Sequence, residues 1–260
     1  MRYGRWIILV LIFGLFFVFS QWPDDQLHVW FCDVGQGDAT VIVKGKFQVL
    51  VDTGPDINKL DTCLSEALPF WDRKIEAVYI SHDQKDHAGA LVELKKRFKI
   101  DKLLTKTKTN DLLRYGNLQI DTLKGVDPDA YVDKNNSTAV NDESVILRMV
   151  YNKFSVLFTG DIDEKAELAL LTSGVLKETQ VLKVAHHGSK YGSTNNFLDV
   201  VKPKLAVVSV GAKNNYGHPN GDTLIRLESV GAKVLRTDKM GSVEINSDGD
   251  KVNIVTTKRD

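Results

Sequence analysis

Residues 81–89, Ser-His-Asp-Gln-Lys-Asp-His-Ala-Gly, constrain the fold more than any other stretch of this sequence. They follow directly on Ile75–Ile80, an apolar and β-branched run that predicts a buried strand. His82, Asp86 and His87 therefore lie close together where that strand ends. Imidazole nitrogens and a carboxylate gathered there can bind a divalent cation, and a bound cation can convert water into a nucleophile at neutral pH. The stretch predicts a metal-dependent hydrolase.

Polar clusters follow other apolar runs in the same way. Five of the six histidines lie beside the ends of such runs: His82, His87, His186, His187 and His218. Three carboxylates are placed likewise: Asp33, Asp52 and Asp161. Residues at strand ends share one rim of a sheet, so groups that are distant in sequence can converge there. A lone histidine at a strand end is usually structural, but this repetition favours a metal site.

Apolar runs alternate with helical spacing after residue 26 and predict a mixed α/β fold with sheets covered by helices. Strands are expected at Leu27–Val34, Thr40–Val43, Phe47–Val51, Ile75–Ile80, Ser144–Val150, Phe154–Thr159, Val181–Ala185, Leu205–Val210, Val234–Arg236, Ser242–Ile245 and Val252–Thr256. Helices are expected at Asn58–Leu68, Asp86–Phe98, Asp163–Leu171, Thr194–Val201 and Thr223–Val230. The polar stretch 124–143 is predicted to be a mobile loop that borders a site.

The N-terminus differs from the rest of the chain. Arg2 and Arg5 precede Trp6–Phe19, a stretch without a charge, and Ser20 supplies a small residue beyond it. This order predicts that residues 1–22 are a signal peptide or, if uncleaved, a single membrane anchor. In either case the remaining chain is expected to be extracytoplasmic, either secreted or anchored to the cytoplasmic membrane.

Charge and cysteine content add two weaker constraints. The 34 basic and 34 acidic residues cancel, so any nucleic acid must be held by a local basic patch instead of a global positive field. Cys32 and Cys63 could pair in an oxidising compartment. Because Cys32 lies inside an apolar run, however, a buried free thiol is the favoured prediction.

Several motifs, taken in order, resemble the metallo-β-lactamase-fold hydrolases, and specifically the C-terminal domain of the competence protein ComEC family. The motifs are Asp33–Ala39, Asp52–Gly54, Ser81–His87, Phe158–Asp161, His186–Ser189 and Tyr216–Pro219. The resemblance covers residues 27–256 and is that of a stand-alone relative, with one hydrolase domain over that range. It implies an α/β fold built as a four-layer αββα sandwich, with the site at the edge between two sheets.

The resemblance also implies a set of metal ligands, carried over residue by residue: His82, Asp86, His87, Asp161 and His186. Asp161 would bridge two cations. His186 is preferred to His187 as the ligand because it directly continues the preceding strand. Asp52 would support the ligands without touching metal.

One ligand position departs from the family pattern. The family carries histidine or aspartate where this chain has Gln84, and Asn141 lies in a region where lactamase-type enzymes supply another histidine. Gln84, Asn141 and Asp38 are therefore expected as weak ligands or as supporting residues. The predicted cofactor is one or two divalent cations, manganese or zinc, with magnesium as a further option.

The favoured function is a phosphodiesterase or nuclease that attacks DNA or another phosphoester through a metal-bound hydroxide. His187, His218 and Asp33 are the catalytic candidates, with a histidine steadying the phosphate or protonating the leaving oxygen. Ser189 and Lys190 are expected to bind substrate. Further lysines could contact backbone phosphates, although a solvated surface is an equally good interpretation: Lys183, Lys202, Lys204 and Lys213.

Two alternatives stay open. The chain could be a non-catalytic module that binds nucleic acid or a phosphorylated ligand at the membrane surface, for which Gln84 is the motivation. It could also hydrolyse another substrate, such as a choline phosphoester or, least favoured, a lactam.

Overall fold

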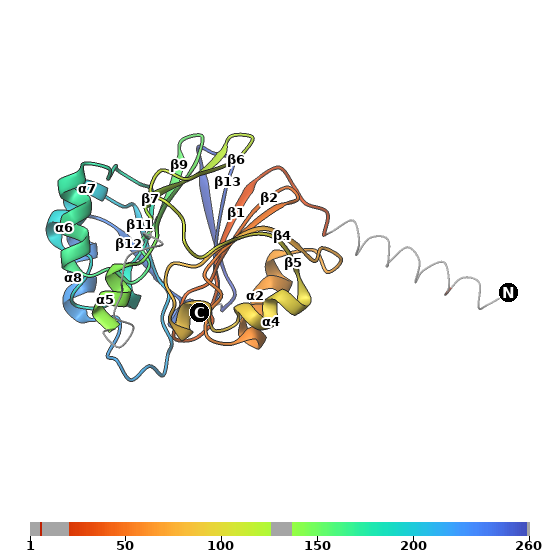
Figure 1. The fold of residues 1–260 in the computed structure, drawn as a ribbon, viewed down its shortest axis with the longest axis horizontal. Helices are drawn as coiled ribbons and strands as arrows, with labels where there is room; N and C mark the ends of the chain where they lie inside the picture. Colours follow the sequence, from red (N-terminus) through yellow and green to blue (C-terminus); the bar gives the residue numbers. More distant parts are fainter. Residues whose placement is uncertain (1–5, 7–20, 126–136, 259–260) are drawn as a thin grey trace.

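The computed structural model describes residues 21–125 and 137–258, together with Trp6, and in these residues the strands form two seven-stranded sheets (Figure 1). The first sheet contains, in order, β14 (Val252–Thr256), β13 (Val243–Ser247), β1 (Leu27–Phe31), β2 (Thr40–Lys44), β3 (Phe47–Val51), β4 (Lys74–Tyr79) and β5 (Lys99–Leu104). The second contains β12 (Lys233–Arg236), β11 (Leu205–Val208), β10 (Val181–Lys183), β9 (Phe154–Phe158), β8 (Ile146–Tyr151), β7 (Leu118–Lys124) and β6 (Leu112–Tyr115).

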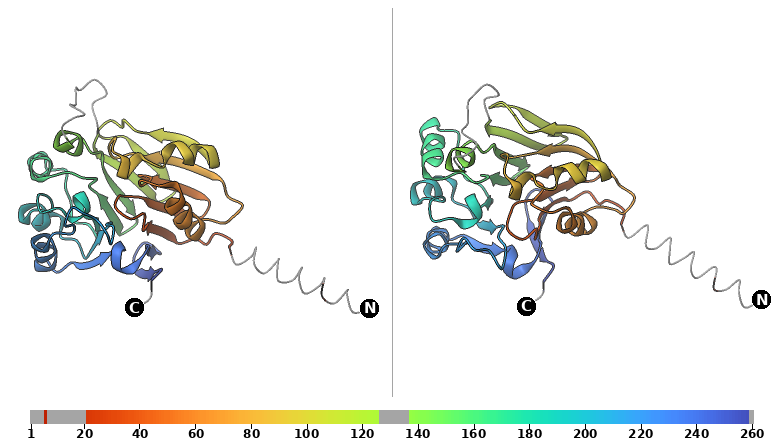
Figure 2. Two further views of the ribbon diagram at one scale, coloured as in Figure 1. Left: turned by 90° about the horizontal axis from the view of Figure 1, so that it is seen from below. Right: turned by 60° about the horizontal axis from the view of Figure 1, so that its bottom comes forward.

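Helices cover the outer face of each sheet (Figures 1 and 2). The first sheet carries α2 (Ile57–Ala67), α3 (Lys85–Ala88) and α4 (Leu91–Arg97), and the second carries α6 (Glu164–Ser173), α7 (Asn195–Val201) and α8 (Gly221–Ser229). One apolar core lies between the two sheets, and each sheet has a further core between it and its helices. The predicted αββα sandwich is therefore confirmed. Three short elements complete it: α5 (Ser137–Asp142), the 3₁₀ turn η1 (Ala185–Gly188) and α9 (Thr237–Met240).

The strand directions decide where polar side chains can meet. The meander β1–β2–β3 and the hairpin β8–β9 are antiparallel, as predicted. Beyond them the first sheet continues in parallel through β4 and β5, and the second through β10, β11 and β12. The carboxyl ends of these parallel strands carry the polar segments that the sequence singles out, so the expected convergence has a structural basis.

Three element predictions need correction. The expected helix 86–98 is broken into α3 and α4, because the carbonyl of His87 accepts hydrogen bonds from the N–H and hydroxyl of Thr53, at 2.7 and 3.0 Å, instead of continuing a helix. Part of the predicted loop 124–143 is the helix α5, and residues 126–136 lie outside the described residues. The strands β5, β6 and β7 were not predicted.

The two cysteines form a disulfide, so the favoured prediction of a free thiol is wrong. Cys32 follows β1 and Cys63 lies on the inner face of α2; their Cα atoms are 5.6 Å apart and both residues are buried. A disulfide at this distance has ordinary geometry. The bond ties α2 to the first sheet, close to the strand ends that carry the polar segments.

The predicted signal or anchor, residues 1–22, lies almost entirely outside the described residues. In the part of the chain that the structure describes, no helix has the length and apolar character needed to cross a bilayer.

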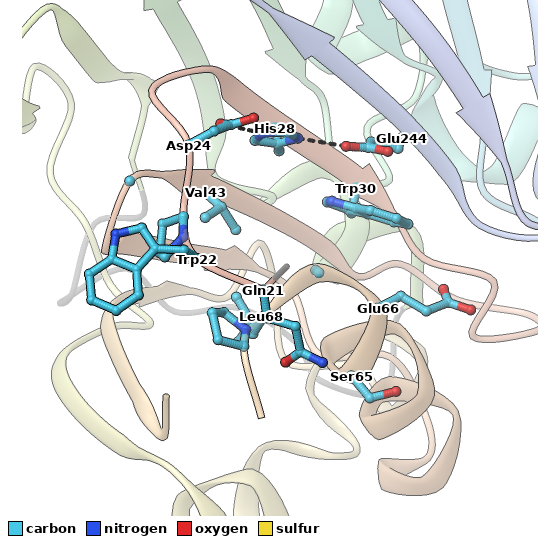
Figure 3. A pocket seen from close by; sticks show the side chains of 14 residues that line it. Gln21, Trp22, Asp24, His28, Trp30, Val43, Ser65, Glu66, Leu68 and Glu244 are labelled. Carbon is cyan, nitrogen blue, oxygen red and sulfur yellow. Dashed lines mark hydrogen bonds and ion pairs between the residues drawn. The ribbon is translucent and has the colours of Figure 1, made fainter. Parts of the chain in front are cut away.

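The sixth histidine, His28, lies near the start of β1 and has a structural role. Its Nδ1 lies 2.6 Å from Glu244 Oε1 and its Nε2 lies 2.9 Å from Asp24 Oδ1, at the edge of a hollow of about 320 Å³ (Figure 3). The hydrogen bond to Glu244 raises the pKa of His28, and Asp24 adds to the effect. His28 thus joins β1 to β13. The hollow beside it shares no lining residue with the cavity of the site described below.

Candidate metal centre

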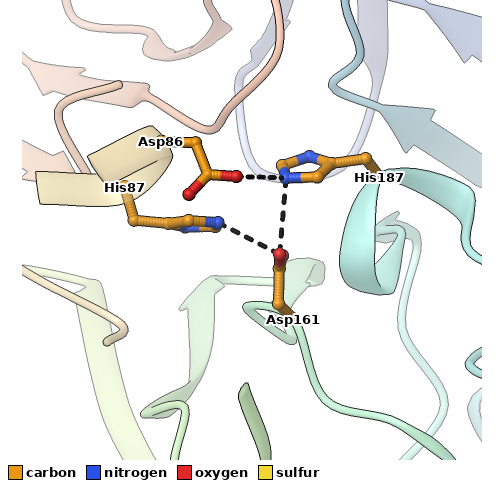
Figure 4. A group of neighbouring side chains, drawn as sticks. All are labelled: Asp86, His87, Asp161 and His187. Atoms are coloured by element: carbon orange, nitrogen blue, oxygen red, sulfur yellow. Dashed lines mark hydrogen bonds and ion pairs between the residues drawn. The ribbon is translucent and has the colours of Figure 1, made fainter. Parts of the chain in front are cut away.

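Four side chains from both sheets converge at the carboxyl ends of the strands (Figure 4). Asp86 and His87 lie on α3, which follows β4; Asp161 follows β9, and His187 lies in η1 after β10. One ligand atom from each lies within 4.8 Å of the others. Two imidazole nitrogens and two carboxylate oxygens at this spacing suit a divalent transition metal.

Two buried polar atoms of this group make no hydrogen bond within the described residues. His87 Nε2 lies 3.2 Å and His187 Nε2 lies 3.3 Å from Asp161 Oδ2, and His187 Nε2 is also 3.3 Å from Asp86 Oδ2. His87 Nε2 and Asp161 Oδ1 are buried and make no hydrogen bond within the described residues. Buried polar atoms are normally satisfied, so the unsatisfied His87 Nε2, which faces Asp161 Oδ2, fits a cation as its absent neighbour.

Asp52 orients His87. Its Oδ2 lies 2.9 Å from His87 Nδ1, and its two oxygens accept hydrogen bonds from the N–H and hydroxyl of Ser81, at 2.7 and 2.8 Å. A carboxylate that receives the Nδ1 proton leaves Nε2 as the ligand atom, a common arrangement around metals. Asp52 itself has a φ of 59°, a left-handed conformation that side-chain-bearing residues rarely adopt. Asp52 thus contacts His87, and its support of a metal ligand stays a prediction.

The structure brings His187, and not His186, into the group of four. Both residues have left-handed backbone conformations, with φ of 49° at His186 and 53° at His187, so the chain turns sharply after β10. His187 Nδ1 then donates to the carbonyl of Ser209 at 2.9 Å and its Nε2 faces Asp86 and Asp161. With both ring nitrogens engaged, His187 has no free position from which to act as an acid on substrate.

His186 lines the same cavity, but its ring nitrogens have other neighbours. Its Nδ1 lies 3.1 Å from Asp163 Oδ1, and its Nε2 lies 3.4 Å from Asn141 Nδ2. Asn141 Oδ1 in turn accepts a hydrogen bond from Gln84 Nε2 at 2.6 Å. The expected weak ligands Gln84 and Asn141 are therefore bonded to each other. Asp163 was not singled out from the sequence.

His82 lies beside the group of four but outside it. Its ring centroid is 4.1 Å from that of His87, and its Nδ1 lies 3.0 Å from Ser81 Oγ and 3.3 Å from Ser144 Oγ. Burial lowers the pKa of His82 to about 4, and the neighbouring His87 adds to the effect, so the ring is neutral. Its buried Nε2 makes no hydrogen bond within the described residues.

A buried ion pair lies beneath the group of four. The ammonium of Lys183, on β10, pairs with Asp38 and lies 3.7 Å from Asp161 Oδ1. Asp38 is also 3.5 Å from His187 Nδ1 and 3.7 Å from His87 Nδ1. Burial alone would lower the pKa of Lys183, but Asp38 and Asp161 raise it above its usual value, so this lysine is charged. Lys183 is only 3% exposed, and the expectation that it contacts phosphates from the surface is wrong.

The charges of this centre are strongly coupled. Burial alone would lower the pKa of His187, but Asp161 and Asp38 raise it to about 9. Asp161 and Asp52 likewise raise the pKa of His87 well above its ordinary value, despite its burial. In the absence of a cation, protons on these rings balance the carboxylates. A bound cation must displace those protons.

Three of the four, Asp86, Asp161 and His187, line an open cavity of about 690 Å³, and His87 is buried behind them. The polar and aromatic residues around the opening include Lys85, Ser189, Tyr191, Tyr216 and His218. The rings of Tyr216 and His218 are stacked at 5.9 Å, and His218 meets His186 edge-on at 5.6 Å. Burial lowers the pKa of His218, with further lowering by His186, so it is neutral at neutral pH.

The two tyrosines were missed by the sequence analysis. Tyr191 is 58% exposed and Tyr216 is 72% exposed, although both line the cavity. Their positions beside His187-Gly188-Ser189 and before Gly217-His218 were the available signal. The Nζ of Lys190 lies 4.8 Å from the ring centroid of Tyr191, so Lys190 supports the opening from outside the cavity lining.

Asp33 is the catalytic candidate that lies neither in the group of four nor in the cavity lining. Its carboxylate lies 3.2 Å from the Nζ of Lys258 and accepts a hydrogen bond from the Gly35 N–H at 3.3 Å. These contacts give Asp33 a role in the turn after β1. Lys202, one of the lysines considered for phosphate contacts, pairs with Glu178 at 2.8 Å.

The sequence comparisons agree with this geometry. Residues 32–152 match the Metallo-beta-lactamase superfamily. "Recombination protein 2" of Haemophilus influenzae is 31% identical over 95% of this chain, and "ComE operon protein 3" of Bacillus subtilis is 28% identical over 82% of it. "Competence protein ComA" of Neisseria gonorrhoeae is 28% identical over 92% of the chain. This chain spans 32% of the first two proteins and 35% of the third, about a third of their length.

A solved structure shows the same fold. The metallo-beta-lactamase fold protein YhfI of Bacillus subtilis superposes with a TM-score of 0.58 at 12% identity, over 86% of this chain and all of that chain. The protein is therefore a metallo-beta-lactamase-fold protein that resembles the competence proteins over most of its length.

Proposed function

We propose that this protein is a metal-dependent phosphodiesterase that acts on nucleic acid. The observation that carries the proposal is the group Asp86, His87, Asp161 and His187, three of which line an open cavity that the neutral His218 lines as well. A bound divalent cation would supply an activated water and offset negative charge on the phosphate.

The residues around the cation would bind and orient the phosphodiester. His218 is the histidine of the cavity that is engaged neither in the group of four nor with Asp163, and because its ring is neutral it can accept a proton near neutral pH. Ser189 lines the cavity, and its hydroxyl accepts a hydrogen bond from the Tyr191 N–H at 3.3 Å. Its own proton therefore points elsewhere and can be donated to a phosphate oxygen.

The exposed tyrosines favour a substrate with bases over a small phosphoester. Aromatic side chains at the edge of a binding site stack with unpaired bases of any sequence, while nearby lysines attract the backbone. Tyr191 with Lys190 and Tyr216 with His218 form two such surfaces at one opening. The names of the relatives, with their references to competence and recombination, support nucleic acid as the partner.

We also place the hydrolase domain in an oxidising, extracytoplasmic compartment. The Cys32–Cys63 disulfide supports this location, because such bonds persist outside the reducing cytosol. The apolar stretch Trp6–Phe19 in the sequence would connect the domain to the membrane if it is uncleaved. Alkylation of free thiols in intact cells, before and after reduction, tests the bond: thiols that react without a reductant would contradict this placement.

Turnover assays test the main proposal. The full chain, loaded with manganese, should hydrolyse both bis-(p-nitrophenyl) phosphate and single-stranded DNA, and chelation should abolish both activities. His218→Gln should slow turnover while leaving metal binding unchanged, whereas His28→Gln, which changes a histidine elsewhere in the fold, should behave as the wild type. Absence of turnover on both substrates by metal-loaded protein would contradict the proposal.

One observation favours the second function, a binding module without turnover. Gln84 and Asn141 are engaged with each other and so add no strong ligand to the centre. In that case single-stranded DNA would bind with the same affinity before and after chelation, and Asp161→Asn would leave that affinity unchanged. The phosphodiesterase proposal expects both treatments to weaken binding.

A further inference from the structure

We infer that this centre holds one divalent cation and not a pair, because a chain of hydrogen bonds through Gln84, Asn141, His186 and Asp163 uses the side chains that a second cation would need. The inference concerns the metal alone and does not depend on which substrate the enzyme takes. The sequence alone left one or two cations open, and we infer one.

The hydrogen bonds of this chain have one consistent direction. Gln84 Nε2 donates to Asn141 Oδ1 at 2.6 Å, and Asn141 Nδ2 lies 3.4 Å from His186 Nε2. His186 Nδ1 lies 3.1 Å from Asp163 Oδ1, so the ring carries its proton on Nδ1 and accepts at Nε2. The lone pair of His186 that could bind a metal is thus committed to an amide.

Exchanging the amide nitrogen and oxygen does not free a ligand. If Asn141 were turned over, its oxygen would face His186 Nε2, which would then need a second ring proton beside Asp163. Gln84 would have to turn over as well in order to accept from Asn141. In both arrangements each amide is bonded to the other, and His186 Nε2 is occupied by a hydrogen bond.

The remaining donors on this side are too few. His82 Nε2 and Asp161 Oδ1 are buried without hydrogen-bond partners in the described part of the chain, and Asp161 already belongs to the group of four. Tightly held zinc takes three or four protein ligands. One histidine and a shared carboxylate fall short of that requirement, whereas Asp86, His87, Asp161 and His187 meet it.

Lys183 supplies the positive charge that a second cation would otherwise add. Its ammonium is buried against Asp38 and lies 3.7 Å from Asp161 Oδ1. Asp38, Asp52 and His87 form a second group of possible ligands, but the two carboxylates already have partners. Lys183 neutralises Asp38, and Asp52 accepts hydrogen bonds from Ser81 and His87. A fixed ammonium balances the negative charge of the carboxylates and, unlike a second metal cation, needs no set of ligand atoms.

Metal stoichiometry tests the inference without any substrate. The full chain is stripped with a chelator, incubated with manganese chloride or zinc chloride, desalted, and analysed by native mass spectrometry and elemental analysis. We expect one cation per chain with either metal. The manganese-loaded protein should give the electron paramagnetic resonance spectrum of an isolated ion. Two cations per chain, or the spectrum of a coupled manganese pair, would overturn the inference.

A gain of function tests the cause. In the double variant Gln84→His with Asn141→His, two imidazoles join His82, so the bound metal should rise from one to two cations per chain. The matched control Gln84→Leu removes one amide without adding a ligand and leaves Asn141 on His186 Nε2, so it should stay at one. If a melting curve shows the double variant folded and it still binds one cation, the amides do not exclude the second ion and the inference fails. If it does not fold, the wild-type stoichiometry decides.

Discussion

The two parts of the site cavity are built differently. On its buried side, four side chains face one another and nearly every other polar atom is fixed by a named partner: Asp52 by Ser81, His187 by Ser209, Asp38 by Lys183. At its opening, Tyr191 and Tyr216 are mostly exposed; the Nζ of Lys190 lies over the ring of Tyr191, and Tyr216 stacks on His218. The buried side determines the chemistry, and the opening determines which substrate reaches it. Changes on the buried side should therefore cost far more than changes at the opening.

The largest effect should come from Asp161. Asp161→Asn removes the carboxylate that faces both His87 and His187, so metal binding should be lost. The catalytic contribution of the cation, several kcal/mol, would go with it, and turnover should fall by roughly 10³-fold. Elemental analysis and turnover of bis-(p-nitrophenyl) phosphate check both parts. If the variant keeps its metal and its turnover falls by less than about tenfold, the buried side of the cavity does not differ from the opening as proposed.

The next largest effect concerns stability. Lys183→Met leaves Asp38 as a buried charge without its partner, which should lower the free energy of unfolding by about 3–5 kcal/mol. The matched double variant Lys183→Met with Asp38→Asn removes both charges and should recover much of that loss. Urea denaturation of the chelated proteins measures the difference. Equal stability of the single and double variants would show that the pair is not coupled.

Metal affinity should rise steeply with pH. The raised pKa values of His187, about 9, and His87 mean that both rings are protonated at neutral pH without metal. Binding displaces these protons, so affinity should increase by about 10- to 100-fold per pH unit between about pH 6 and pH 8. His82, with a pKa of about 4, adds nothing to this slope. Calorimetric titrations with manganese measure it; an affinity independent of pH would contradict the role of both histidines.

A smaller effect should separate the support of His87 from that of His186. Asp52→Asn disturbs the orientation of His87 and should weaken metal binding by about 10- to 100-fold. Asp163→Asn makes the same chemical change beside His186 and should leave the affinity for one cation nearly unchanged. The same calorimetric titration compares them. Equal losses in the two variants would return His186 to the ligand set.

The smallest effect belongs to the opening. Tyr216→Ala or Tyr191→Ala should raise the KM for single-stranded DNA by about 5- to 10-fold, the lower part of the range for base stacking. Phenylalanine at either position should restore it, and neither change should affect bis-(p-nitrophenyl) phosphate. Trp71→Ala, which removes an exposed aromatic ring outside the cavity, serves as the control. An equal loss on both substrates would show that the tyrosines stabilise the centre and do not bind bases.

Strand ends made much of this site predictable from the sequence. Asp86, His87, Asp161 and the supporting Asp52 follow apolar runs, and parallel strands bring their ends together. The choice between His186 and His187 was not predictable. Both residues have left-handed backbone conformations, which change the directions of their side chains, and no periodicity in the sequence indicates such a turn. Asp33 follows an apolar run as well, but its turn directs it to Lys258.

The missed strands and contacts have physical reasons too. β5 reads Lys-Ile-Asp-Lys-Leu-Leu and is largely exposed at the edge of its sheet, so it lacks the apolar signature of a buried strand. β7 alternates buried Leu118, Ile120 and Thr122 with more exposed residues, a period of two that was present but short. The spacing of Cys32 and Cys63 says nothing of their distance until α2 is placed on the sheet.

Anomalous diffraction from crystals soaked in manganese or zinc tests the central claim most directly. We expect a single strong peak at the metal edge, within coordination distance of Asp86, His87, Asp161 and His187 in each chain. A peak centred on His186, or no peak among these four residues at saturating metal, would contradict it.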